Sequence, residues 1–157
     1  MKYLGYIIVF IVIILAALFL RGQLPEIPPV EEELWLVLDV LDMDAVRVKN
    51  GEIEKIVYLS GVNAIEKFPE KLGCYNQEAW DFLKEKVTGE KVKLIPENDK
   101  YYIILDAINI NAEMIRLGYA TFYEEPIKLA PTFKLLEEDA RKNGRGLWSA
   151  CQFISEK

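Results

Sequence analysis

The sequence contains no histidine among its 157 residues and only two cysteines. Without histidine, the chain cannot build a Ser-His-Asp or Cys-His catalytic group, a histidine general base or a zinc site with histidine ligands. Two thiolates are too few for a four-cysteine zinc or iron–sulfur site. Any catalysis must therefore come from carboxylates, Lys, Arg, Tyr, Ser or a metal ion held by oxygen ligands.

Positive charge is also scarce, because 19 Lys and Arg residues face 25 Asp and Glu residues and the net charge is −6. Apolar residues make up 52% of the chain and charged residues 28%. This composition excludes a disordered chain, a collagen-like chain and a basic protein that coats nucleic acid. The length leaves room for one domain and little more.

One long uncharged run covers residues 3–20, between Lys2 and Arg21. A helix of that length would reach about 27 Å, close to the hydrocarbon thickness of a bilayer. We therefore expect residues 1–21 to be a transmembrane anchor of a single-pass protein that contacts the membrane through this helix. The positive-inside rule, by which Lys and Arg gather on the cytoplasmic side of a membrane helix, favours an extracytoplasmic domain. A cleaved signal peptide and a buried core helix are the alternatives.

Residues 22–33 are rich in Pro and Glu, which is typical of an extended, solvated tether. The soluble domain is then expected at residues 34–157. Residues 22–157 hold 17 basic and 25 acidic residues, a net charge of −8. A groove that follows phosphates needs positive potential, so we expect little binding of nucleic acid.

Short apolar and alternating runs predict strands at residues 34–41, 45–49, 53–62, 91–95 and 101–108, with a strong hairpin signal at Asn50-Gly51. Helical periodicity predicts helices at residues 76–88, 111–117 and 132–143. This order favours an α+β fold, mainly β, in which three helices pack on a five-stranded barrel. The barrel would be of the oligonucleotide/oligosaccharide-binding (OB) type.

The sequence resembles the staphylococcal nuclease-like (thermonuclease) domain family over about residues 34 to 151. The matching stretches are residues 40–46, 59–66, 74–79 and 110–120, the last followed by residues 138–141 and 146–148. The resemblance implies the same OB-type barrel with three helices. Active members cleave DNA or RNA with one calcium ion, aspartate ligands, a glutamate near the attacking water and two arginines on the phosphate. Such cleavage builds negative charge on phosphate oxygens, which a metal and fixed cations stabilise.

The resemblance assigns the predicted metal ligands and the catalytic glutamate to specific residues. Asp42 and Asp44 fall on the two aspartates of the first turn, although solvated turn carboxylates are an equal alternative. Asn63 falls on a third ligand and Glu66 on the glutamate. Because Asn63 brings no charge, we expect a weak or lost calcium site.

The two arginine positions depart most from the family. They fall on Tyr58, whose side chain can donate one neutral hydrogen bond, and on Ile103, whose side chain can donate none. Each lost cation costs roughly 3–4 kcal/mol of transition-state stabilisation. We therefore expect an inactive relative that serves as a binding or structural module, with an unknown protein partner. The alternative is a calcium-dependent nuclease with an atypical site, in which Arg47 or Lys100 substitutes for a missing arginine.

Two further features have alternative interpretations. Four aromatic residues could stack bases or simply pack in the fold: Tyr101, Tyr102, Phe122 and Tyr123. The resemblance also implies a disulfide between Cys74 and Cys151, because secreted relatives carry cysteines at similar places. That bond would need an oxidising compartment, whereas the alternative is two reduced, buried thiols.

Overall fold

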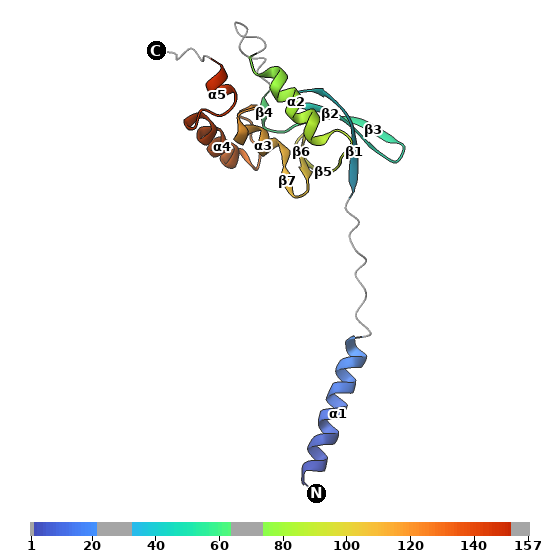
Figure 1. The fold of residues 1–157 in the computed structure, drawn as a ribbon. Coiled ribbons are helices and arrows are strands. Elements are labelled where there is room, and N and C mark those ends of the chain that lie inside the picture. The colour runs from blue at the N-terminus through green and yellow to red at the C-terminus, as the bar shows by residue number, and fades with distance from the viewer. Residues whose placement is uncertain (1, 22–32, 64–73, 152–157) are drawn as a thin grey trace. The chain divides into compact units, whose positions relative to one another are not determined.

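The computed structural model describes residues 2–21, 33–63 and 74–151. The chain divides into two compact units, Met1–Glu31 and Glu32–Lys157. The tether expected at residues 22–33 therefore lies almost entirely outside the described residues, as does Glu66. The two units are considered separately below, and their elements are labelled in Figure 1.

The first unit contains one helix of 20 residues, α1 (Lys2–Arg21). In the part of the chain that the structure describes, no helix combines the length and the apolar character needed to cross a membrane. The predicted transmembrane anchor and the single-pass localisation with an extracytoplasmic domain are therefore wrong.

The second unit is built on a six-stranded antiparallel sheet with the strand order β3-β2-β1-β5-β6-β7. Its strands are β1 (Leu34–Asp42), β2 (Ala45–Asn50), β3 (Ile53–Tyr58), β5 (Lys91–Glu97), β6 (Lys100–Leu105) and β7 (Ile108–Asn109). The short strands β4 (Val62–Asn63) and β8 (Thr121–Phe122) form a second, two-stranded sheet.

The large sheet curls so that β3 meets β6 at the far side. β1 carries two bulge-like register shifts against β2, which let one strand bend and pair with both β2 and β5. Just after β3, Leu59 forms a parallel bridge with Tyr101, and the N–H of Ser60 donates to the Tyr101 carbonyl at 2.9 Å. These contacts join the two sides, as an OB-like barrel requires.

Four helices accompany this barrel in the described part of the second unit (Figure 1): α2 (Asn76–Val87), α3 (Ile110–Leu117), α4 (Ala130–Lys142) and α5 (Leu147–Ala150). The buried faces of α2, α3 and α4 form one core with the strands. Fully buried members of that core include Val46, Val57, Ile103, Met114 and Phe133. These three helices thus bury their apolar side chains against the barrel, whereas Leu147 of α5 lies in a separate small cluster.

The structure corrects the strand count, because eight short strands within the described residues replace the five that were predicted. The run at residues 53–62 divides into β3 and β4, since Gly61 between them has a φ of +71°. A Cβ at Gly61 would lie 2.7 Å from Ile127 Cδ1 and from the Phe133 ring, so this position requires glycine. The run at residues 101–108 divides at a turn formed by Asp106 and Ala107.

The predicted disulfide is confirmed. Cys74 and Cys151 are bonded, with their Cα atoms 5.9 Å apart and a sequence separation of 77. The bond joins the residue two positions before α2 to the residue that follows α5. It lies in a small apolar cluster with Leu147, Tyr75 and Trp148, outside the main core.

The β6–β7 turn contains a strained pair, and relieving the strain should stabilise the fold. Asp106 and Ala107 have φ values of 47° and 67°, where residues other than glycine are disfavoured by about 1–2 kcal/mol each. We expect Ala107→Gly to raise the free energy of unfolding in urea by about 0.5–1 kcal/mol. The matched control is Gly51→Ala, at a φ of 56° with open space around the Cβ, which should lower it. Equal effects of the two changes would contradict this explanation.

Removing the disulfide should lower the free energy of unfolding by much more than the turn substitutions change it. In the chain-entropy picture, a loop of this length is worth about 4–5 kcal/mol. The variant with Cys74→Ser and Cys151→Ser should lose that amount of unfolding free energy in urea. Unmodified protein in dithiothreitol should unfold at the same urea concentration as the variant. A loss below about 1 kcal/mol would show that the bond does not clamp the fold.

Candidate functional site

The turn between β1 and β2 carries the two acidic residues expected to bind metal. Asp42 is exposed, and its Oδ1 accepts a hydrogen bond from the Met43 N–H at 2.7 Å. Met43 itself is buried, so it anchors the turn while the acids flank it. Asp44 is half-buried, and its carbonyl accepts from the Leu59 N–H at 2.8 Å. The turn is therefore tied directly to the end of β3.

Tyr58 and Asn63 lie on the strands that follow. Tyr58 ends β3, pairs with Ala45 and is 50% exposed, so its phenol is open to solvent beside the acidic turn. Asn63 on β4 is half-buried, and its Nδ2 lies 3.4 Å from Thr121 Oγ1 on β8. The β-sheet register thus brings Tyr58 next to the acidic turn, and Asn63 follows five residues later.

Ile103 is placed differently. Its side chain is fully buried in the core, so a side chain at this position points into the barrel and away from solvent. Lys100, three residues earlier, begins β6, and its Nζ lies 3.3 Å from Glu125 Oε2. The position that the resemblance assigns to the second arginine is therefore in the interior of the barrel.

Arg47, the other expected substitute, and Lys55 on β3 are also engaged. Arg47 is exposed, and its Nη2 lies 3.4 Å from Asp39 Oδ2, which is a weak surface ion pair. Lys55 lies over the Trp35 ring at 4.1 Å and donates to the Tyr101 hydroxyl at 3.3 Å. Both side chains therefore have partners other than the acidic turn.

The aromatic residues considered for base stacking are largely packing residues. Tyr102 and Phe122 are buried and make edge-on contacts with Phe133, at ring-centroid distances of 6.0 and 5.9 Å. Tyr101 contacts Lys55, as described above. Tyr123 is 37% exposed, and its ring lies 5.3 Å from Lys100 Nζ.

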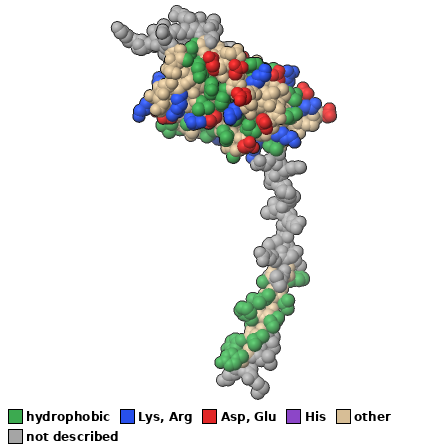
Figure 2. Space-filling view, viewed as in Figure 1, with side chains coloured by type: hydrophobic (Ala, Val, Ile, Leu, Met, Phe, Trp, Pro, Cys, Tyr) green, Lys and Arg blue, Asp and Glu red, His purple; other side chains and the backbone are tan. Residues whose placement is uncertain are grey.

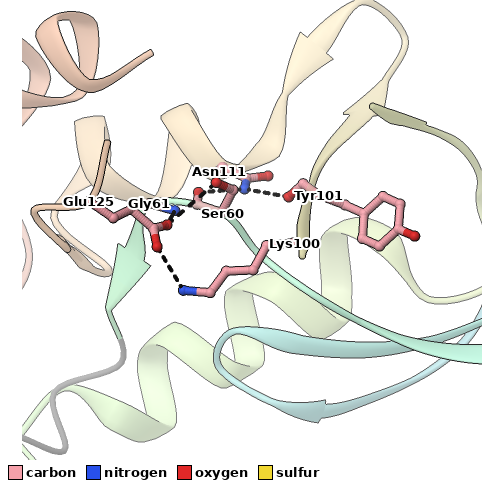
Figure 3. Close-up of polar contacts among 6 residues, drawn as sticks. All are labelled: Ser60, Gly61, Lys100, Tyr101, Asn111 and Glu125. Carbon is pink, nitrogen blue, oxygen red and sulfur yellow. Dashed lines mark hydrogen bonds and ion pairs between the residues drawn. The ribbon is translucent and has the colours of Figure 1, made fainter. Parts of the chain in front are cut away.

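A polar network that the sequence did not reveal holds the link between β3 and β4 (Figure 3). Asn111 is fully buried at the start of α3, and its Nδ2 donates to the carbonyls of Ser60 and Tyr101 at 2.9 and 3.0 Å. Its Oδ1 accepts from the Ile103 N–H at 3.0 Å. The available signal was a polar residue on the apolar face that Ile110 and Met114 define.

Glu125 supports the same link from the other side. Its Oε1 accepts from the Gly61 N–H at 2.8 Å, and its Oε2 pairs with Lys100. Nothing in the local sequence distinguishes Glu125 from Glu124, which instead forms an exposed ion pair with Lys134 at 2.8 Å. Only the fold separates the two neighbouring glutamates.

Comparison with known proteins identifies the family. Residues 56–150 match the family model described as staphylococcal nuclease homologue. The chain belongs to the staphylococcal nuclease family. This nuclease-family domain is 32% identical over 120 residues to an uncharacterized endonuclease of Escherichia coli, covering 72% of the chain and 75% of that protein. It is 27% identical over 130 residues to the thermonuclease of Staphylococcus hyicus, covering 75% and 77%.

Calcium is plausible for this nuclease-family domain, but the described residues offer few ligands. Among them, no group of three or more Asp, Glu, Cys or His side chains is arranged to hold a metal ion. Asp42 and Asp44 supply carboxylates from one turn, and the Asn63 amide contacts Thr121. Calcium prefers six to eight oxygen ligands, so water or further groups would have to complete its shell.

One carboxyl group couples the stability of this region to pH. Glu137 on α4 accepts a hydrogen bond from the Phe122 N–H of β8 at 3.1 Å, and β8 pairs with the strand that carries Asn63. Burial raises the pKa of Glu137 above its usual 4.5, and the Phe122 hydrogen bond and Arg141 offset this in part. The folded protein therefore favours the protonated form, and ionisation of Glu137 destabilises it.

We expect Glu137→Gln to stabilise the domain at pH 7 and to have less effect near pH 4. Below pH 4.5, the wild-type carboxyl is protonated in both the folded and unfolded states, and the advantage of the amide disappears. Urea unfolding at the two pH values measures the difference. The exposed neighbour Glu138→Gln is the control. An effect of Glu137→Gln that is independent of pH would contradict a raised pKa.

Proposed function

We propose that this domain retains the nuclease fold but has lost efficient phosphodiester cleavage, and that it serves as a binding or structural module. The observation that carries the proposal is Tyr58, a neutral and exposed phenol beside the acidic β1–β2 turn, where the family resemblance expects an arginine. A phenol can donate one hydrogen bond but cannot neutralise a developing phosphate charge.

The expected loss of cleavage rate follows from the charged hydrogen-bond donors that are missing. Removing one charged donor from a developing anion slows a reaction by roughly 10²–10³-fold. With both arginines replaced, the factor is about 10⁴–10⁶ if the losses multiply. Ile103 supports this estimate, because it offers no donor and lies in the core.

The metal site is expected to be weak as well. Asp42, Asp44 and the Asn63 carbonyl would be the ligands, which gives two formal charges where the family has three. Glu66 would orient the attacking water, a prediction that lies outside the described residues. A calcium ion bound there would polarise the phosphate, and its weaker binding would lower activity further.

A calcium-dependent nuclease with an atypical site is the second candidate. It is favoured by the relatives of this chain, which include an uncharacterized endonuclease and a thermonuclease. This candidate needs a cation at the phosphate, and Arg47 or Lys100 would have to supply it. Both are paired with carboxylates, Arg47 with Asp39 and Lys100 with Glu125. Each would have to leave its partner to bind a phosphate.

Digestion of single-stranded DNA and RNA by the full chain, in calcium and in excess EGTA, tests the proposal. We expect no cleavage above the EGTA background. Tyr58→Arg combined with Asn63→Asp should raise the calcium-dependent rate by about 100-fold over the matched control, Tyr58→Phe combined with Asn63→Asp.

The opposite outcome is equally definite. Robust calcium-dependent cleavage by the unmodified chain, abolished by Glu66→Gln and by Asp42→Asn, would establish the second candidate. A catalytically active calcium-dependent nuclease, assayed in parallel, confirms that the substrate and the buffer support cleavage.

A further inference from the structure

Three hydrogen-bond donors surround one carboxylate at the link between β3 and β4. The Gly61 N–H lies 2.8 Å from Glu125 Oε1, and the Ser60 hydroxyl oxygen lies 3.5 Å from the same atom. Lys100 Nζ lies 3.3 Å from Glu125 Oε2. Figure 3 shows the Gly61 and Ser60 donors on one side of the carboxylate and Lys100 on the other.

The three donors come from parts of the barrel that hold them in place. Ser60 and Gly61 are buried, and Asn111 fixes the Ser60 carbonyl at 2.9 Å. Gly61 cannot be replaced, because a Cβ would collide with Phe133. A backbone N–H, a hydroxyl and an ammonium that converge at fixed positions are typical of an oxyanion site.

Glu125 reaches these donors from a segment anchored to the same link. The Tyr123 N–H donates to the Gly61 carbonyl at 3.0 Å, two residues before Glu125. The Glu125 side chain is 16% exposed and that of Lys100 is 25% exposed, so the carboxylate lies close to solvent without facing it fully. A small anion could therefore reach the same position from solvent once Glu125 is removed.

We propose that Ser60, Gly61 and Lys100 form an oxyanion-binding cradle that Glu125 fills from within the chain. The ligand class is a small oxyanion, either a carboxylate or a phosphate group. Glu125 is then an internal competitor that neutralises Lys100 and keeps external anions out. In this respect the inference rests on the proposed function and deepens it, because it explains why Lys100 does not serve as a phosphate-binding cation.

The cradle is tested by binding and not by cleavage, so it can fail independently of the proposed function. Glu125→Ala is prepared in the full chain and titrated with acetate or phosphate, against chloride at equal ionic strength. We expect the backbone amide resonance of Gly61 to shift with either oxyanion in this variant and not in wild type. The melting temperature should rise by about 2–5 °C at tens of millimolar anion.

Two further variants identify the binding groups. Lys100→Met, added to Glu125→Ala, should weaken anion binding about tenfold or more, because a charge-assisted hydrogen bond is lost. Glu124→Ala removes the neighbouring carboxylate, which pairs with Lys134 outside the cradle, and should bind no anion. Acetate and phosphate are titrated separately, so their affinities show which oxyanion the cradle prefers.

The result that overturns the proposal is a folded Glu125→Ala protein whose Gly61 resonance and melting temperature respond to neither oxyanion. Glu125 would then be a structural ion-pair partner only. Glu125→Ser is measured in parallel in case the alanine variant does not fold, because its short side chain vacates the position of the carboxylate and leaves Lys100 unneutralised. An oxyanion-dependent rise in its melting temperature supports the cradle, and the absence of any rise contradicts it.

Discussion

The hydrogen bonds of the Asn111 side-chain amide are the interactions on which the geometry of the barrel mouth depends. The barrel mouth here means the acidic β1–β2 turn, Tyr58 and the link between β3 and β4. The amide bonds to three backbone groups, the Ser60 carbonyl in the link between β3 and β4 and the Tyr101 carbonyl and Ile103 N–H on β6. Because Asn111 is fully buried, losing it would take this partner from the Ser60 carbonyl and the Ile103 N–H, at about 1–3 kcal/mol each, whereas the Tyr101 carbonyl would still accept from the Ser60 N–H. One amide thus joins α3, β6 and the link between β3 and β4.

That link sets what the neighbouring side chains can do. Tyr58 lies two residues before Ser60, and Asn63 lies two residues after Gly61, so both depend on how the link is held. Glu125 completes the support by binding the Gly61 N–H. The other carboxylate oxygen of Glu125 pairs with Lys100, so the positive charge of Lys100 is neutralised within the fold. The barrel mouth therefore contains the acidic β1–β2 turn, whereas Lys100 is paired with Glu125.

The sequence predicted what local patterns determine, and it missed what distant contacts determine. Asn50-Gly51 marked the β2–β3 hairpin correctly, and the cysteines paired as the family resemblance implied. The transmembrane helix was wrong, and the strand count was too low because backbone turns at Gly61 and Asp106 interrupt apolar runs. The roles of Asn111 and Glu125 arise from residues up to 65 positions away, which no local pattern encodes.

The central claim is that, among the residues the structure describes, the cations discussed above (Arg47, Lys55 and Lys100) are engaged and are not free to bind phosphate. The most direct measurement is the salt dependence of single-stranded oligonucleotide affinity in the presence of calcium. Each phosphate neutralised by a protein cation contributes about −0.7 to the slope of log K against log salt for single strands. The account predicts affinity weaker than about 100 μM with a slope near zero. Micromolar binding with a slope equivalent to two or more phosphates would contradict it.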